Sequence, residues 1–213
     1  MIRQPFYNLI SRSYLNLNRT YVKIKLLSLM AFLSIFLGGC EDIDNKDVYN
    51  FVGDSIIYQW PLNVTFPSQI VYNYGRSGVG VNYLERYNNS FKNQNVVVMI
   101  GTNDYYLFYR DNISDYMESY LEIINNLTDL KIYLISVLPR EYKGDPEDIN
   151  TKIEEFNSLV KSHLQEYPKI DYIDVYNDFL YKDHINYQYY VDGLHLTIYG
   201  YDLLSSKILE KIK

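Results

Sequence analysis

The chain is poor in the residues that build metal centres and disulfide frameworks. Its 213 residues include one cysteine, Cys40, and three histidines, His163, His184 and His195. A single cysteine excludes an intramolecular disulfide and a cysteine-rich zinc site, and three scattered histidines disfavour a multi-histidine metal cluster. We therefore expect a protein that works with no metal and no other cofactor.

Basic residues are also scarce, with 20 lysines and arginines against 26 acidic residues and a net charge of −6. A nucleic-acid partner requires a basic face, so this balance argues against nucleic-acid binding. The hydrophobic fraction of 47% and the charged fraction of 22% are those of a globular protein, which excludes a disordered or collagen-like chain. The length allows one ordinary domain, or at most two small ones.

The charge is divided unevenly along the chain. Residues 1–40 hold five basic residues and no acidic residue, whereas all 26 acidic residues follow Cys40. In the first part, Leu26–Leu37 is an apolar run that is shorter than the roughly 20 residues of a membrane-spanning helix. Its length, and Lys23 and Lys25 before it, are typical of the hydrophobic segment of a secretory signal peptide. The alternative is a buried core helix that ends in two glycines.

The tetrapeptide Leu-Gly-Gly-Cys at Leu37–Cys40 resembles the lipobox of bacterial lipoproteins. The resemblance implies cleavage before Cys40 and acylation of its thiol and of the new amino group. We expect a signal peptide over residues 1–39, a lipidated cysteine with an acidic tether over 40–47, and a folded domain over 48–213. The expected location is outside the cytoplasm, with the lipid anchor on Cys40 in a bacterial membrane, on the periplasmic side or at the cell surface.

From residue 48 onward, short apolar segments alternate with longer amphipathic ones. The short segments are rich in β-branched and aromatic residues and are bounded by Gly, Asn, Asp or Pro, which predicts strands. They are Val48–Val52, Ile70–Tyr74, Val96–Ile100, Ile132–Val137 and Tyr172–Val175. The continuous apolar sequence of Val96–Ile100 indicates a strand that is buried on both faces.

The longer segments have a helical period. Apolar residues recur at steps of three and four over 113–127 and over 149–164, and a last helix is predicted over Ile198–Ile212 with Thr197 as its N-cap. Alternating strands and helices imply right-handed crossovers and a parallel sheet that is covered on both faces. We predict an α/β fold, a three-layer α/β/α sandwich with a five-stranded parallel sheet. Functional residues in such folds gather at the carboxyl ends of the strands.

Polar or glycine-rich segments occupy those strand ends. They are Gly53-Asp54-Ser55, Asn73-Tyr74-Gly75-Arg76-Ser77-Gly78, Gly101-Thr102-Asn103-Asp104 and, before the last helix, Asp192-Gly193-Leu194-His195. A serine nucleophile needs a base, and a histidine base needs a carboxylate that orients its other ring nitrogen. Asp192 and His195 are spaced to meet across a tight turn, and the sheet would bring Ser55 to them. A free N–H of Gly75 and the amide of Asn103 are suitable donors to an oxyanion.

These four blocks, in this order, resemble those of the SGNH hydrolases, also called GDSL esterases, which are named for a Ser, a Gly, an Asn and a His. The resemblance covers residues 48–213 and extends to the stretch Ile135–Arg140 and to Leu196 and Gly200 after the histidine. It implies the flavodoxin-like fold of that family. It also implies a catalytic triad of Ser55, Asp192 and His195, and an oxyanion hole formed by Ser55, Gly75 and Asn103. The chain departs from the family at 57–59, where many members carry a small or acidic residue and a glycine. This departure concerns the specificity for the leaving group.

Several of these residues have structural alternatives. Ser55 could be a helix N-cap, and His195 could be a structural histidine. We assign His163 to the core or its margin and give His184 no role. The glycines of 75–80 do not have the spacing of a dinucleotide-binding fingerprint, and the G-x-S-x-G elbow of α/β-hydrolases is absent.

Aromatic residues flank the motifs and could form walls that stack on sugar rings or line an acyl pocket. They are Tyr58, Trp60, Tyr105, Tyr106, Tyr187, Tyr189 and Tyr190. The alternative is a compositional bias, because the chain contains 25 tyrosines.

The sequence thus predicts a secreted, membrane-tethered serine esterase that hydrolyses carboxylic esters through an acyl-enzyme. The resemblance implies a small-molecule or oligosaccharide ester as substrate, in particular short acetyl groups on carbohydrate. One alternative is a lysophospholipase or thioesterase that acts on longer acyl chains. An alternative from another class is a non-catalytic binding lipoprotein with the same fold.

Overall fold

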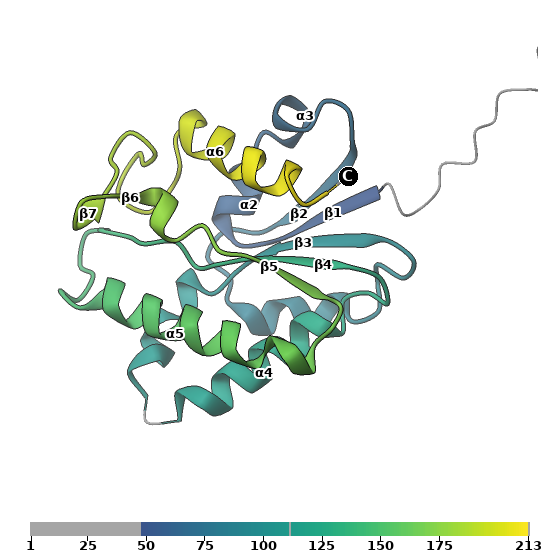
Figure 1. Ribbon diagram of the computed structural model, residues 1–213, viewed down its shortest axis with the longest axis horizontal. Coiled ribbons are helices and arrows are strands. Elements are labelled where there is room, and N and C mark those ends of the chain that lie inside the picture. Colours follow the sequence, from purple (N-terminus) through teal and green to yellow (C-terminus); the bar gives the residue numbers. More distant parts are fainter. Residues whose placement is uncertain (1–47, 111, 213) are drawn as a thin grey trace, which may run out of the picture. The chain divides into compact units, whose positions relative to one another are not determined.

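The computed structural model describes residues 48–110 and 112–212, and the signal peptide and lipidated cysteine predicted over 1–47 lie outside these residues. Five parallel strands form one sheet in the order β2-β1-β3-β4-β5 (Figure 1). They are β1 (Val48–Gly53), β2 (Ile70–Gly75), β3 (Asn95–Met99), β4 (Ile132–Ile135) and β5 (Ile170–Ile173). The prediction of a five-stranded parallel sheet is confirmed.

The strand order positions the functional edge of the sheet. The chain moves from β1 outward to β2 and then returns to pair β3 with the other side of β1, so the order reverses between β1 and β3. In open parallel sheets, ligands bind outside the carboxyl ends of the strands at such a switch point. Ser55 and Asn103 lie in the segments that come next after β1 and β3.

Helices cover both faces of the sheet (Figure 1). One layer holds α2 (Ser55–Gln59), α3 (Leu62–Thr65) and α6 (Ile198–Leu209), and the other holds α4 (Ile113–Asn125) and α5 (Ile149–His163). Successive strand residues point to opposite faces, so Phe51 joins the core beneath α6 while Val52 joins the core beneath α4. All residues of β1, β3 and β4 are buried, which confirms the two-sided burial predicted from the apolar run in β3.

Shorter elements complete the chain. The 3₁₀ helices are η2 (Val81–Tyr87), η3 (Thr102–Tyr109), η4 (Leu164–Glu166) and η5 (Asn177–Phe179), and β6 (Leu180–Tyr181) pairs antiparallel with β7 (His184–Ile185). None of these was predicted, because each is too short to show a hydrophobic period. Thr197 caps α6 as predicted, with its side chain accepting a hydrogen bond from the Gly200 N–H. Across 48–110 and 112–212, we find no helix with the length and hydrophobicity needed to cross a membrane.

Two strand ends differ from the prediction for a physical reason. The predicted β4 continued to Val137 and the predicted β5 to Val175, but both strands end two residues earlier. Asn157 of α5 donates to the Val137 carbonyl and accepts from the Val137 N–H, and the Ser136 hydroxyl accepts from the Val175 N–H. These side chains take the place of the backbone hydrogen-bond partners that a neighbouring strand would supply. The backbone therefore leaves the sheet before the apolar sequence ends.

Candidate active site

Ser55 lies at the start of α2, directly after β1. Asp54 is the N-cap of this helix, and its Oδ1 accepts a hydrogen bond of 2.9 Å from the Ile56 N–H. From α6, the Tyr201 hydroxyl donates to the Ile56 carbonyl at 2.9 Å and fixes the same turn. Since Asp54 caps the helix, the alternative interpretation of Ser55 as an N-cap is wrong, and the Ser55 hydroxyl is free for another partner.

That partner is His195. Its Nε2 lies 3.1 Å from Ser55 Oγ, and its Nδ1 lies 2.8 Å from Asp192 Oδ2. A carboxylate can only accept, so Nδ1 carries the proton and Nε2 is left to accept from the serine hydroxyl. The structure therefore brings together the three residues that the sequence places in one site, although Ser55 is 140 positions from His195 in the chain.

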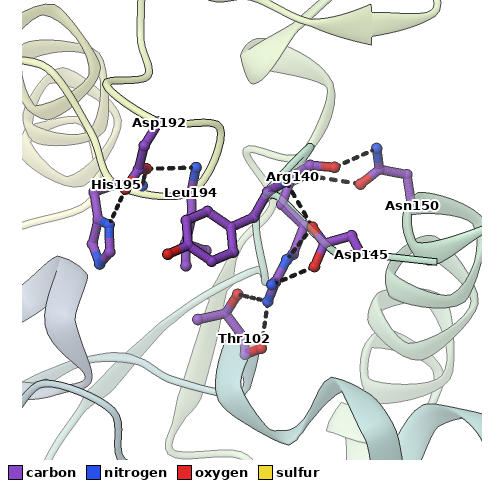
Figure 2. Close-up of polar contacts among 8 residues, drawn as sticks. Thr102, Arg140, Asp145, Asn150, Asp192, Leu194 and His195 are labelled. Carbon is purple, nitrogen blue, oxygen red and sulfur yellow. Dashed lines mark hydrogen bonds and ion pairs between the residues drawn. The ribbon is translucent and has the colours of Figure 1, made fainter. Parts of the chain in front are cut away.

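The turn from Asp192 to His195 is ordered by its own carboxylate (Figure 2). Asp192 Oδ1 accepts from the backbone N–H groups of Leu194, at 3.0 Å, and His195, at 2.7 Å, while Oδ2 binds the imidazole. Partial burial opposes ionisation of Asp192, but the hydrogen bonds from His195 and Leu194 outweigh it, and the pKa of this carboxyl is lowered. Asp192 is therefore an anion at neutral pH.

Asn103 lies in η3, which is separated from the end of β3 by two residues. Its side-chain Nδ2 donates a hydrogen bond of 2.9 Å to the Val79 carbonyl, in the loop that follows β2. An amide carries two N–H donors, so this bond orients the group and leaves one donor for a ligand. The side chain is partly buried, as expected for a donor held at the edge of a site.

The oxyanion role predicted for Gly75 is not supported. Its N–H is not free, because it donates to Asn73 Oδ1 at 2.9 Å, and Asn73 Nδ2 in turn donates to the Ile57 carbonyl at 2.7 Å. A Cβ at position 75 would lie 2.2 Å from the Tyr58 backbone nitrogen. Glycine is needed here because α2 packs directly against the end of β2.

An ion pair beside Asn103 was not among the predicted site residues. The Arg140 guanidinium forms two hydrogen bonds to the Asp145 carboxylate, at 2.9 and 2.6 Å, and also donates to the Thr102 carbonyl at 2.8 Å (Figure 2). Arg140 is only 4% exposed. The sequence offered a weak signal, since Arg140 ends the segment 135–140 that takes part in the family resemblance, but nothing in it indicated burial or a role in the site.

The remaining histidines and aromatic residues take different places. His163 lies at the margin of the core, where its Nδ1 contacts the Leu159 carbonyl at 2.9 Å. His184 is exposed, and its Nδ1 lies 3.3 Å from the Glu141 carboxylate, a contact that the sequence did not indicate. Trp60 and Tyr190 are core residues, whereas three of the flanking tyrosines are exposed by more than half, namely Tyr58, Tyr106 and Tyr187.

The carboxyl group of Asp54 is fully buried beneath the site. Burial raises its pKa from 3.8 to about 7. The hydrogen bond from Ile56 opposes this rise, nearby Asp104 adds to it, and His195 and Arg140 oppose it. Asp54 can therefore hold a proton at pH values where an exposed aspartate is ionised.

Replacing Asp54 by Asn is expected to make the protein less sensitive to rising pH. The folded state retains a proton on Asp54 between about pH 4 and about pH 7 that the unfolded state has lost, so the free energy of unfolding falls as the pH rises through that window. Asn caps a helix as well as Asp and cannot ionise. The gain in Tm over wild type should be larger at pH 8 than at pH 5, by about 2–4 °C for each kcal/mol recovered.

Asp202→Asn, the same exchange at an exposed position of α6, is the control and should give equal differences at both pH values. An Asp54→Asn protein whose Tm difference from wild type is the same at pH 5 and pH 8 would contradict the interpretation.

The arrangement has the parts required for acyl transfer. A hydroxyl is hydrogen-bonded to an imidazole, the imidazole is oriented by an anionic carboxylate, and an amide donor lies at the neighbouring strand end. In the described part of the chain, no three His, Cys, Asp or Glu side chains are placed to hold a metal ion.

Known proteins share this organisation. Residues 51–203 match the GDSL-like Lipase/Acylhydrolase family. Over 119 residues the chain is 29% identical to the platelet-activating factor acetylhydrolase IB subunit alpha2 of Gallus gallus, a match that covers 55% of this chain and 51% of that protein. The chain thus spans about half the length of this curated relative.

Two solved structures share the fold. A putative acylhydrolase from Bacteroides fragilis is similar with a TM-score of 0.67 and 24% identity, over 78% of this chain and 86% of that one. An acetylxylan esterase from Geobacillus stearothermophilus has a TM-score of 0.56 and 17% identity, over 80% of this chain and 96% of that one. Since the family match spans most of the chain and contains all four blocks, the chain belongs to the GDSL-like lipase/acylhydrolase family, also called SGNH, whose members hydrolyse esters.

Proposed function

We propose that this hydrolase is a serine esterase with Ser55, His195 and Asp192 as its catalytic triad. The observation that carries the proposal is His195, whose two ring nitrogens bridge Ser55 Oγ and Asp192. Ser55 Oγ attacks the ester carbonyl while Nε2 takes its proton, and the imidazolium then protonates the departing alcohol. Water, deprotonated by His195 in turn, attacks the acyl-enzyme and releases the acid and free Ser55.

The oxyanion of each tetrahedral intermediate needs convergent donors. As the first residue of α2, Ser55 has a backbone N–H without an intrahelical acceptor, and the Asn103 amide supplies a second donor. We assign the third donor to Gly78 in place of Gly75. Gly78 has a φ of 74°, a Cβ there would meet no atom within 4 Å, and it precedes Val79, which binds Asn103. Within 48–110 and 112–212, its N–H donates to no backbone carbonyl.

Asn103→Ala is expected to lower kcat by about 10²–10³ with little change in KM. The carbonyl oxygen bears nearly a full negative charge only in the tetrahedral intermediate, so a fixed donor acts mostly on the transition state. Asn103→Asp should lower kcat more than Asn103→Ala does, because a carboxylate repels the developing oxyanion. Steady-state kinetics and Tm should be measured on the same preparations.

Asn82→Ala, at an exposed position of η2, is the matched control for the exchange. A folded Asn103→Ala protein with the kcat of wild type would remove Asn103 from the oxyanion hole, and Asn103 would then only shape its loop.

For the substrate, we propose short acyl groups, in particular acetyl, on carbohydrate. Three exposed tyrosines support this proposal because each is linked to the site. Tyr58 shares α2 with Ser55, Tyr106 shares η3 with Asn103, and the Tyr187 hydroxyl donates to Glu141, whose N–H binds the Gly193 carbonyl. Exposed aromatic rings at the edge of a site can stack on sugar rings. Two similar proteins, the platelet-activating factor acetylhydrolase subunit and the acetylxylan esterase, are named for the removal of acetyl groups, which agrees with this choice.

The substrate proposal is tested with p-nitrophenyl esters from acetyl to palmitoyl, beside acetylated xylooligosaccharides. We expect kcat/KM to be highest for the acetyl ester and to fall as the chain lengthens, with acetate released from the oligosaccharide. Ser55→Ala protein serves as the blank. A kcat/KM that rises with chain length would instead indicate a lysophospholipase or thioesterase, and no turnover of any ester would indicate a non-catalytic binding protein.

We also propose that the enzyme is tethered by a lipid on Cys40 and works outside the cytoplasm. The support is the sequence of residues 23–40, with its basic flank, apolar run and Leu-Gly-Gly-Cys. Cys40→Ser is expected to abolish incorporation of labelled fatty acid and to move esterase activity out of the membrane fraction. The control is Ser55→Ala, which should keep its lipid label. Undiminished labelling of the Cys40→Ser protein would show that the lipid is not on this cysteine.

A further inference from the structure

We propose that Arg140 is a positioning residue that holds the Asn103 amide in place for the oxyanion. The inference rests on the proposed function, in which Asn103 is an oxyanion donor. Arg140 follows β4 and is not one of the reacting residues in our mechanism. Its side chain reaches back to the loop after β3, where it contacts Thr102 before Asn103 (Figure 2) and Tyr105 after it.

The first contact fixes the backbone before Asn103. Arg140 Nη1 donates to the Thr102 carbonyl at 2.8 Å and lies 3.1 Å from the Thr102 hydroxyl. That carbonyl belongs to the same planar peptide unit as the Asn103 N–H, so holding it sets the direction in which the Asn103 side chain leaves the backbone. The second contact lies two residues after Asn103, where the guanidinium carbon stands 4.8 Å from the centre of the Tyr105 ring.

Arg140 can act as a rigid support because it is held from several directions. Asp145 accepts from Nε and Nη2 in a bidentate pair, and Asn150 of α5 accepts from the Arg140 N–H and donates to its carbonyl, at 2.8 and 2.9 Å. The Asp145 and Arg140 side chains are 7% and 5% exposed. Asp145 compensates the buried charge, so Arg140 acts through geometry and not as a free cation near the oxyanion.

The geometry requires arginine. A planar guanidinium can bind a carboxylate through two donors, a carbonyl through a third, and stack on a ring, whereas an ammonium group cannot do all of these at once. Lysine at 140 would retain the positive charge beside Asp145 but lose the fork that reaches Thr102. A displacement of about 1 Å at a reacting group can lower a rate by about 10².

The test is a double-mutant cycle of Arg140→Lys with Asn103→Ala, read as kcat, KM and Tm. We expect Arg140→Lys to lower kcat by about 10- to 100-fold with little change in KM. In the Asn103→Ala background, the same exchange should lower kcat by less than about twofold, because the group that Arg140 positions is already gone. Arg86→Lys is the matched control, since Arg86 is exposed and lies 4.6 Å from the Tyr83 ring.

If Arg140→Lys fails to fold, Thr102→Val takes its place in the double-mutant cycle with Asn103→Ala. It removes the hydroxyl acceptor and leaves the ion pair with Asp145 intact, so we expect a severalfold loss of kcat that again disappears in the Asn103→Ala background. An equal loss of kcat in both backgrounds, or a folded Arg140→Lys protein with the kcat of wild type, overturns the inference about Arg140. Either result leaves the proposed oxyanion role of Asn103 unaffected. Asn103→Ala with unchanged kcat removes the oxyanion role itself, and the inference with it.

Discussion

Ser55→Ala is expected to lower kcat by about 10⁶ while leaving the fold intact. The variant lacks the oxygen that attacks the ester, and the His195 Nε2 that lies 3.1 Å from it then has no nucleophile to deprotonate. The backbone N–H of residue 55 and the Asn103 amide remain. We therefore expect a small residual rate above the uncatalysed reaction, from binding and oxyanion stabilisation.

Stability separates the catalytic role of Ser55 from a structural one. Asp54 caps α2, so removing the Ser55 hydroxyl costs no cap, and alanine is the most favourable residue for a helix. The Tm should stay within about 4 °C of wild type, because the change is worth less than about 1 kcal/mol.

Covalent labelling completes the test of Ser55. A fluorophosphonate should phosphonylate wild type with loss of fluoride and place the added mass on the peptide that contains Ser55, and Ser55→Ala should not react. Ser206→Ala is the control, because Ser206 lies on α6 with its hydroxyl bonded to the Leu203 carbonyl. Label on another serine, or undiminished turnover by Ser55→Ala, would refute the proposed nucleophile.

The parts of the fold that the sequence predicts are those with a local hydrophobic signal. The apolar run in β3 identifies a strand covered on both faces, and the three- and four-residue steps of α4 identify a helix with one buried side. The exact strand ends are less predictable because they depend on side chains far away in the chain. Asn157 ends β4 by binding both polar groups of the Val137 backbone, and no pattern near residue 137 indicates that contact.

The residues of the candidate site show the same contrast between local sequence signals and contacts made only in the folded chain. The proximity of Ser55, Asp192 and His195 can be predicted because residue type, order and strand position place them at one edge of the sheet. The oxyanion role predicted for Gly75 is not supported, because the sequence cannot show whether an N–H already has an acceptor, and here Asn73 accepts from it. Arg140 escapes prediction for a related reason, since a charged residue in a loop is ordinarily exposed. Its burial follows from partners that are close only in the folded chain, Thr102 above all.

Asp192→Asn is expected to lower kcat by about 10⁴ in a protein that still folds. The local geometry explains why an exchange of one oxygen for nitrogen is so costly. In wild type, Asp192 Oδ1 accepts from the Leu194 and His195 N–H groups, while Oδ2 accepts from the imidazole Nδ1. An amide nitrogen cannot accept, so the single oxygen of the new side chain must stay with the two backbone donors.

The amide nitrogen that the Asp192→Asn exchange introduces is then left facing His195 Nδ1, to which it can only donate. The imidazole must accept at Nδ1 and carry its proton on Nε2, so the nitrogen that faces Ser55 Oγ can no longer take the serine proton. Because the turn keeps its two backbone hydrogen bonds, we expect a loss of kcat with a small change in Tm. Asp183→Asn, in the exposed turn between β6 and β7, is the matched control and should retain full activity. A folded Asp192→Asn protein with kcat within tenfold of wild type would show that His195 does not depend on this carboxylate for its tautomer.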